Sequence, residues 1–181
     1  MELHHPTKWS FSFVTVPNTT IEQDTTLRAK WLGVYYVIFD SDGGTIAATQ
    51  AIVPGNKAAE PEKPVREGHV FAGWHLITFD TENRKMIMER ATYDFDTVVT
   101  GTIALKARWV DATKILTLPD HIQTVESEAF SGIESAEAVR LPGSFTGFGA
   151  NSFDADLVVL VPKGSNSATQ ASTLGYLVVE E

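Results

Sequence analysis

Apolar and polar residues alternate over several short runs of this chain, and most runs end at turn-forming residues. The first clear run, Tyr35 to Asp40, is rich in aromatic and β-branched residues and is followed by Ser41-Asp42-Gly43-Gly44. Asp-Gly and Gly-Gly steps adopt positive φ at low cost and favour tight turns. The pattern therefore predicts a strand over 35–40 and a returning strand over 45–53.

Four further strands are predicted before residue 110. Pro54, Pro61 and Pro64 break regular structure and leave room for a short helix or an irregular loop before a strand over 69–74. The apolar runs 76–79 and 85–88 flank Asp80-Thr81-Glu82-Asn83, which predicts a hairpin, with an amphipathic helix as the alternative. A strand over 103–109 completes a compact, mainly antiparallel β unit, which we place at residues 34–110.

The end of this unit occurs twice in the chain. Thr26-Leu27-Arg28-Ala29-Lys30-Trp31 and Ala104-Leu105-Lys106-Ala107-Arg108-Trp109 both alternate apolar and basic residues before a Trp. Repetition at this scale indicates a duplicated structural unit. We therefore interpret residues 1–33 as the C-terminal remnant of a preceding repeat, and expect the chain to be the C-terminal piece of a longer protein.

A second period, of 23 residues, runs through the C-terminal segment, 111–181. The matched pairs are Leu118-Pro119 with Leu141-Pro142, Ile122 with Phe145, Val125 with Phe148, and Phe130 with Phe153. Such a period predicts a short solenoid, in which parallel strands stack and apolar residues form columns. A helix over 166–174, capped by Ser165 or Asn166 and ended by Gly175, and a last strand over 176–179 would cap it.

Composition narrows the classes of partner. The chain has 181 residues, no cysteine, and a formal net charge of −9. An acidic chain is a poor ligand for phosphate backbones, which excludes nucleic acid as an expected partner. The first residues lack the pattern of a signal peptide, and no apolar stretch reaches the roughly 18 residues of a membrane span. We therefore expect no membrane insertion by this segment, and an export signal upstream of it.

Two groups of residues could suggest metal binding. Asp40-Ser41-Asp42-Gly43-Gly44 offers alternate carboxylates, but the spacing of a calcium-binding EF-hand fails because Thr45 and Ala51 stand where Gly and Glu are required. The five histidines form no zinc-binding pattern; they are His4, His5, His69, His75 and His121. A turn and packing or surface roles are the favoured interpretations.

The sequence evidence for catalytic and glycan-binding residues is also weak. Ser144, in Gly143-Ser144-Phe145-Thr146-Gly147, is not placed as in a nucleophile elbow. Asp94 and Asp96 would share one face of a strand and could not face each other across a cleft, as a glycosidase pair must. Six aromatic residues could stack on sugars, although their repeat-defining positions favour a core role; they are Trp31, Trp74, Trp109, Tyr35, Tyr36 and Tyr93. We therefore predict no catalytic, cofactor-binding or metal-binding residues, no cofactor, and a protein that is not an enzyme.

With these motifs in place, residues 35–109 resemble the Listeria-Bacteroides repeat, also called the internalin B repeat. The resemblance rests on Tyr-x-Val-x-Phe-Asp-x-x-Gly-Gly from Tyr35 or Tyr36 to Gly44, on Pro61-x-x-Pro64 with Glu67-Gly68, on Phe71-x-Gly73-Trp74, on Tyr93-Asp94-Phe95, and on Leu105-x-Ala107-x-Trp109. His69 and a long stretch from His75 to Thr92 depart from the usual pattern. The resemblance implies a β-grasp-like module found in tandem on bacterial surface proteins.

Residues 115–181 are similar to BspA-type leucine-rich repeats. The similarity rests on Leu118-Pro119-x-x-Ile122-x-x-Val125 with Ala129-Phe130, and on Val161-Pro162-Lys163-Gly164 with Gly175-Tyr176 as a C-terminal cap. Together the two resemblances imply a secreted, cell-surface or wall-associated bacterial protein that acts in adhesion or protein-protein interaction, with a surface protein or a glycan of the host or of bacteria as partner. In this interpretation the β repeats are spacers and the leucine-rich segment is the recognition surface. The alternative is an accessory carbohydrate-binding region of a polysaccharide-degrading enzyme. The sequence does not identify the ligand-binding residues.

Overall fold

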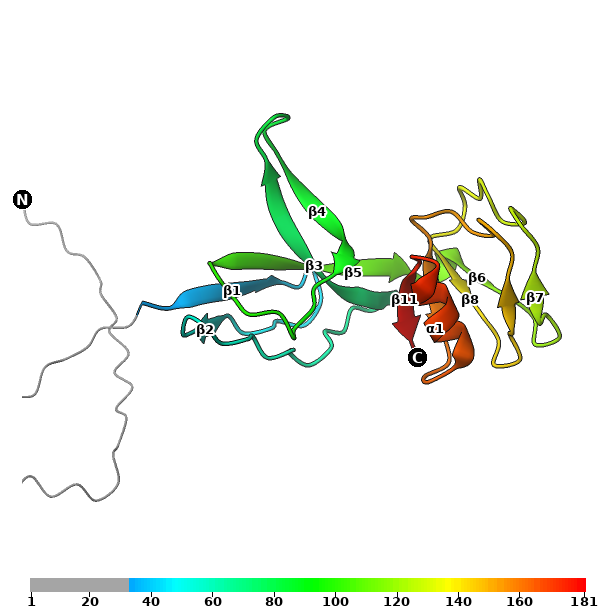
Figure 1. Ribbon diagram of the computed structural model, residues 1–181, viewed down its shortest axis with the longest axis horizontal. Helices are drawn as coiled ribbons and strands as arrows, with labels where there is room; N and C mark the ends of the chain where they lie inside the picture. The colour runs from blue at the N-terminus through cyan, green and yellow to red at the C-terminus, as the bar shows by residue number, and fades with distance from the viewer. Residues whose placement is uncertain (1–32) are drawn as a thin grey trace, which may run out of the picture. The chain divides into compact units, whose positions relative to one another are not determined.

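The structure, a computed structural model, describes residues 33–181. These residues form a mainly β protein with three sheets, one α-helix and one short 3-10 helix, which confirms the predicted mainly β class (Figure 1). They belong to one compact unit, Leu32–Glu181. The predicted repeat remnant at 1–33 lies, except for its last residue, outside the described residues.

The first part of the described chain is a five-stranded sheet with the order β2-β1-β5-β3-β4. Its pairs are antiparallel, except that β1 and β5 run parallel. The strands are β1 (Tyr35–Asp40), β2 (Gln50–Ile52), β3 (His69–Asp80), β4 (Lys85–Thr92) and β5 (Ile103–Asp111). The predicted strands at 35–40 and 103–109 and the predicted hairpin are thus present.

Alternation along β1 and β5 explains why one face of this sheet is buried. Val37 and Phe39 of β1 and Leu105 and Ala107 of β5 are buried, while the residues between them are more exposed. Successive side chains of a strand point to opposite faces. One face of the sheet therefore carries an aromatic core, and its central Trp74 is 2% exposed.

Strand β3 is longer than predicted, because the predicted strands 69–74 and 76–79 form one element. Its pairing with β5 shifts register between Phe71 and Trp74, where Gly73 has φ of 106°. A Cβ on Gly73 would lie 2.5 Å from Cγ2 of Thr92, so the bulge needs glycine at this point. The bulge lets one strand belong to both the central sheet and the hairpin.

The predicted returning strand at 45–53 is mostly absent; only β2 remains of it. The backbone N–H of Thr45 donates to the Val65 carbonyl at 3.0 Å, and the Val65 N–H donates to Oγ1 of Thr45 at 3.0 Å. Thr45 is therefore held by the loop before β3, out of reach of a full antiparallel pairing with β1. The proline-rich stretch 54–68 is an irregular loop without a helix, one of the two predicted outcomes.

After a 3-10 helix, η1 (Ala112–Lys114), the chain stacks short strands in parallel. One ladder has the order β11-β10-β8-β6, and a second pairs β7 with β9. The strands are β6 (Ile115–Thr117), β7 (Thr124–Val125), β8 (Ala138–Arg140), β9 (Gly147–Phe148), β10 (Val158–Val161) and β11 (Leu177–Glu180). The predicted column of Phe130 and Phe153 is also present, with ring centroids 5.3 Å apart.

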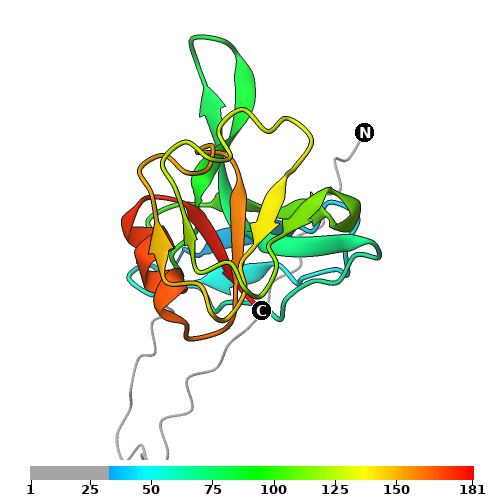
Figure 2. The ribbon, with the colours of Figure 1, turned by 90° about the vertical axis from the view of Figure 1, so that its right-hand side faces the viewer.

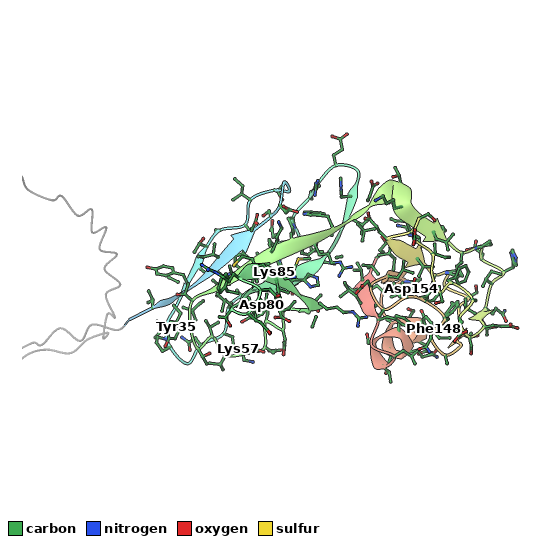
Figure 3. The ribbon with its side chains drawn as sticks, turned by 90° about the horizontal axis from the view of Figure 1, so that it is seen from above. Tyr35, Lys57, Asp80, Lys85, Phe148 and Asp154 are labelled. Carbon is green, nitrogen blue, oxygen red and sulfur yellow. The ribbon has the colours of Figure 1, made fainter. Side chains whose placement is uncertain are left out.

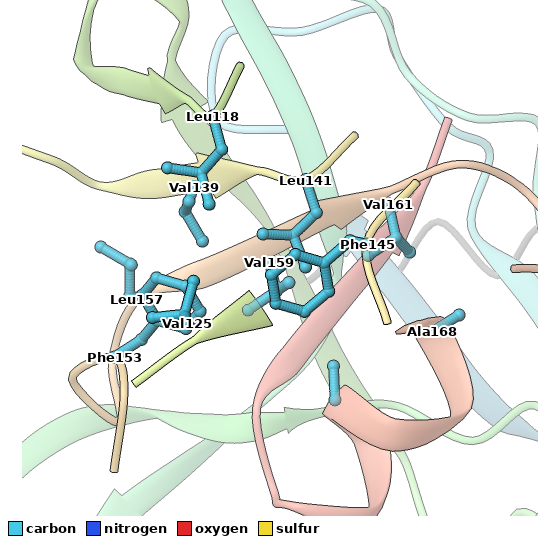
Figure 4. Packing of buried hydrophobic residues seen from close by; sticks show 11 residues of the cluster. Leu118, Val125, Val139, Leu141, Phe145, Phe153, Leu157, Val159, Val161 and Ala168 are labelled. Carbon is cyan, nitrogen blue, oxygen red and sulfur yellow. The ribbon is translucent and has the colours of Figure 1, made fainter. Parts of the chain in front are cut away.

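Inside these ladders lies a core of aliphatic residues and phenylalanines (Figure 4). Helix α1 (Asn166–Thr173) closes it with Ala168 and Ala171. Oγ of Ser165 accepts from the backbone N–H of Ala168, and Gly175 follows the helix with φ of 81°. The predicted helix and both of its end signals are confirmed.

A further buried cluster joins the five-stranded sheet to the parallel ladder. Ala72 and Val110 come from β3 and β5, and they pack with Ala138, Val158 and Leu160 of the ladder. All five are at most 1% exposed. The described residues therefore share buried apolar surface across residue 111, where the two sequence patterns meet.

Candidate interaction surface

A groove with a volume of about 1090 Å³ lies between β5 and two later loops. One wall is the outer face of β5, with Lys106 and Arg108, and the other is formed by loop residues at 133–137 and 154–157. Charged side chains of both signs line it, so its contacts with any ligand would be mainly polar. Figure 3 shows the side chains in this part of the molecule, with Asp154 labelled.

The basic wall is partly neutralised by the turn after β1. Nζ of Lys106 lies 2.9 Å from Oδ1 of Asp42 and 3.9 Å from Oδ2 of Asp40. The hydrogen bond to Asp42 is the largest effect and raises the pKa of Lys106. Burial, the next largest, lowers it, and the charges of Asp42 and Asp40 raise it further. Lys106 therefore stays charged and positions the turn.

Glu137, at the end of the loop wall, lies where the sheet and the ladder meet. Its Oε1 lies 2.6 Å from Nζ of Lys114, and its Oε2 accepts from the backbone N–H of Asp111 at 3.0 Å. The hydrogen bond from Lys114, followed by that from Asp111, lowers the pKa of Glu137. The same contact raises the pKa of Lys114.

One hydrogen bond crosses the groove to a main-chain carbonyl, and a second joins the loops of the far wall to each other. A guanidinium N–H of Arg108 donates to the Asp156 carbonyl at 2.9 Å, and Asp154 accepts from the backbone N–H of Gly132 at 2.9 Å. This arrangement is suited to hydrogen-bonded recognition of a polar partner.

The predicted turn at 40–44 is present, and its carboxylates are used within the protein. Asp42 and Gly43 have φ of 45° and 88°, and Oδ1 of Asp40 accepts from the Asp42 N–H at 3.0 Å. A Cβ on Gly44 would lie 2.5 Å from the ring of Trp109, whose Nε1 donates to the Ser41 carbonyl at 3.0 Å. The Gly-Gly pair thus allows the turn to pack on the Trp that closes the unit.

Among residues 33–181 the histidines are not brought together. His75 is fully buried in β3, with Nδ1 at 2.9 Å from the Glu89 carbonyl oxygen and Nε2 at 3.2 Å from that of Ala72. Nδ1 of His69 lies 2.9 Å from the Glu67 carbonyl oxygen, and His121 is exposed. Within residues 33–181 no three metal-ligating side chains cluster. His4 and His5 lie outside the described residues.

The aromatic residues divide between core and surface. Trp74 is buried between Phe39 and Phe71, with centroids 4.9 and 5.5 Å away, as its repeat-defining position predicts. Trp109, Tyr35 and Tyr93 are partly buried, and Tyr36 is 47% exposed. Burial raises the pKa of Tyr93, and the charge of Asp94 adds to this. Trp31 lies outside the described residues.

The remaining candidates for catalysis have structural partners. Nζ of Lys57 lies 2.9 Å from Oδ1 of Asp96, while Asp94 accepts from the Asp96 N–H at 2.8 Å. Oγ of Ser144 donates to the Asp120 carbonyl. These contacts stabilise the loops in which the residues lie.

The groove residues Lys106, Arg108 and Glu137 were not singled out from sequence. For the two basic residues a signal exists, because Arg28 and Lys30 occupy the matching positions of the earlier tail. Glu137 follows no motif, since its role depends on where the ladder meets η1.

Known proteins resemble parts of the chain. Two proteins of Evansella cellulosilytica match it. One is provisionally described as a membrane protein and is 33% identical over 71% of this chain and 19% of its own length. The other is provisionally described as a Gly-rich membrane protein and is 35% identical over 50% of this chain and 10% of its own length. The chain thus spans less than a fifth of these relatives. None of the helices among residues 33–181 is long and apolar enough to cross a membrane.

No solved structure matches the chain significantly. The family model described as the Listeria-Bacteroides repeat domain matches residues 35–108, a domain typical of surface proteins. This match confirms the resemblance predicted for 35–109. Residues 35–108 thus carry the sequence pattern of a Listeria-Bacteroides repeat domain.

Proposed function

We propose that this chain belongs to a bacterial surface repeat protein that acts by adhesion or protein-protein interaction and not by catalysis. In this proposal residues 34–110 are a β-grasp-like spacer repeat. Residues 111–181 are a BspA-type leucine-rich solenoid with a C-terminal cap, and they carry the recognition surface. The family match at 35–108 and the descriptions of the relatives support a surface location.

The distribution of charge is the observation that carries the assignment of recognition to residues 111–181. This segment has ten acidic and three basic side chains, a difference of −7, against ten and eight in residues 33–110, a difference of −2. Glu126, Glu128 and Asp156 are exposed on its loops. A surface of one sign attracts partners of the other sign and speeds their association. We therefore infer a partner with a basic surface.

A binding assay with matched charge reversals tests this assignment. The double variant Glu126→Lys and Glu128→Lys changes the charge of the C-terminal segment, and Glu60→Lys with Glu62→Lys makes the same change on an exposed loop of the repeat. Beads coated with the chain should adhere to source or host cells, and only the first variant should abolish adhesion. Equal loss with both variants would contradict recognition by the C-terminal segment.

Location is tested separately by brief trypsin treatment of intact source cells. Peptides from Tyr35 to Trp109 released without lysis support a surface protein. Peptides found only after lysis would overturn the surface proposal and leave an intracellular scaffold.

The glycan-binding alternative makes a different prediction. Stacking on sugars needs exposed aromatic rings, and Trp74 is buried whereas Tyr36 is 47% exposed. Binding to purified polysaccharides that is insensitive to salt and lost in Tyr36→Ala would favour this alternative over a basic protein partner.

A further inference from the structure

The β3–β4 hairpin carries an exposed apolar face. Its distal half extends away from the rest of the sheet (Figures 1 and 2). Ile77 lies opposite Met88, and Phe79 lies opposite Met86, so the four side chains share one face. Phe79 is 56% exposed, Met86 62% and Met88 39%. Such a concentration of apolar surface at one place is typical of a contact site.

The outer edge of this hairpin has backbone groups available for pairing. In the sheet formed by residues 33–181, β4 is an edge strand. The Glu89 carbonyl faces β3, where it accepts from the ring of His75 at 2.9 Å. Backbone groups alternate sides along a strand, so those of Met88 and Met86 face outward. Edge groups of this kind are a template for another strand.

The sequence of β4 is complementary to itself when it is reversed about Ile87. In an antiparallel pair centred there, Lys85 of each strand lies opposite Glu89 of the other, and Met86 lies opposite Met88. The outward groups of Met86 and Met88 then hydrogen-bond in pairs, as an antiparallel ladder requires. Centring on Met88 would instead place Glu89 against Ile87. Only the first of these two registers matches charge with opposite charge and apolar with apolar side chains.

We propose that β4 pairs antiparallel with β4 of a second copy of this chain, centred on Ile87, so that the two sheets join edge to edge. The apolar faces of the two hairpins become continuous across the pair, with Met86 of each chain beside Met88 of the other. This homotypic contact goes beyond the proposed function, and it does not depend on the partner of the C-terminal segment.

The base of β4 limits the length of the pairing. A guanidinium N–H of Arg90 donates to the Gly175 carbonyl at 3.0 Å, so the C-terminal segment covers the strand there. Pairing is then confined to Lys85–Glu89. A contact of five residues buries less area than a stable dimer, which gives a weak interaction with a dissociation constant on the order of 0.1 mM. Tethering many copies to one surface would raise its occupancy.

Charge reversal in the full chain tests the contact and its register. Lys85→Glu places two pairs of glutamates opposite each other, and Glu89→Lys two pairs of lysines. Each variant alone should weaken dimerisation on the order of tenfold, measured by sedimentation over a concentration series. An equimolar mixture of the two variants restores opposite charges and should dimerise like the unchanged chain. Lys63→Glu, an equal change on an exposed loop, should have no effect.

A cysteine cross-link tests the centre of the pair, because the chain has no cysteine of its own. Residues facing each other in a non-hydrogen-bonded antiparallel pair have Cα atoms about 4.5 Å apart, within disulfide range. Ile87→Cys should therefore form a covalent dimer faster than Met88→Cys or the exposed turn variant Thr81→Cys. Equal melting temperatures of the three reduced variants would exclude a difference in folding.

The following outcomes overturn the proposal. One is an unchanged chain that stays monomeric up to about 1 mM, which would leave the edge of β4 to a different protein. Another is a mixture of the charge variants that dimerises no better than either alone. Faster cross-linking through Met88→Cys than through Ile87→Cys would show that the strands pair in another register.

Discussion

The five-stranded sheet and the parallel ladder bury their apolar residues in different ways. The sheet packs aromatic rings from distant points of the chain: Trp74 makes edge contacts with Phe39 and with Phe71, and Trp109 packs against Phe71. The ladder stacks short strands in parallel, and each strand pairs with a strand 19 to 23 residues away in the sequence. The first core is therefore global, and the second is a sum of neighbouring contacts.

This difference predicts how far the effect of a mutation extends through each region. Removing a ring from the sheet should destabilise strands that are far apart in sequence. Adding volume between two strands of the ladder should first destabilise their immediate neighbours. The cluster of Ala72, Val110, Ala138, Val158 and Leu160 limits the contrast, because it joins the two cores. Mutations in each region test how strongly this buried cluster couples the unfolding of the sheet to that of the ladder.

The largest effect is expected for Trp74→Ala. The side chain is 2% exposed and contacts Phe39 and Phe71, so its removal leaves a large cavity and should cost about 3 to 5 kcal/mol of unfolding free energy. Urea unfolding followed by far-UV circular dichroism measures this. Tyr36→Ala, on the exposed face of β1, is the matched control and should cost far less. A small loss in Trp74→Ala would contradict a global aromatic core.

Gly149→Ala tests the ladder. A Cβ on Gly149 would lie 2.2 Å from the backbone nitrogen of Ser127 and 2.4 Å from the carbonyl carbon of Glu126, so two adjacent coils would have to separate. Overpacking of this kind costs about 1 to 3 kcal/mol. Gly143→Ala is the control, since nothing lies within 4 Å of its Cβ position. Equal thermal stability of the two variants would show that the coils are not closely stacked.

The sequence predicted the two regions unequally, for physical reasons. In the ladder, the fixed 23-residue spacing of Phe130 and Phe153 and of Val125 and Phe148 specifies which residues stack, so the columns could be predicted. In the sheet, the predicted strand ended at Trp74, whereas the positive φ of Gly73 lets β3 continue through a bulge. Local turn chemistry does not distinguish these outcomes, because they depend on pairing with β5.

The candidate site was harder to predict than the fold. Its groove forms where residues of β5 face loops some 25 to 50 positions later, and no periodic pattern links them. The contact of Glu137 with the Asp111 N–H depends on the docking of the ladder against the sheet. Local patterns predict strands and caps well, but contacts between two differently built regions follow from packing alone.

A smaller effect, local to the end of the ladder, is expected for Ser165→Ala. Its hydroxyl caps α1 by accepting from the Ala168 N–H, and loss of such a cap costs about 1 kcal/mol. Ser165→Asp retains an acceptor and should keep most of the stability. Hydrogen exchange should show the loss mainly in α1 and β11 if the ladder is a sum of neighbouring contacts. Equal loss of protection in β1 would instead show that the joined cores unfold together.

The smallest effect concerns pH and the junction of the two regions. Glu137 has a lowered pKa because Lys114 and the Asp111 N–H stabilise its carboxylate. A carboxyl with a pKa below its unfolded value contributes stability above that unfolded value, near 4.5, and loses the contribution as pH falls through the folded value. The melting temperature of the unchanged chain should therefore fall more steeply below pH 4.5 than that of Glu137→Gln, which cannot titrate. The difference in melting temperature between the two chains should be widest near neutral pH and narrow in acid. It should stay small because Glu137 and Lys114 are partly exposed.

The control is Glu134→Gln, on the exposed loop beside Glu137, which should leave the pH dependence unchanged. A gap that does not narrow in acid would mean that the carboxylate does not join the sheet to the ladder, and that the buried cluster alone holds the two regions together.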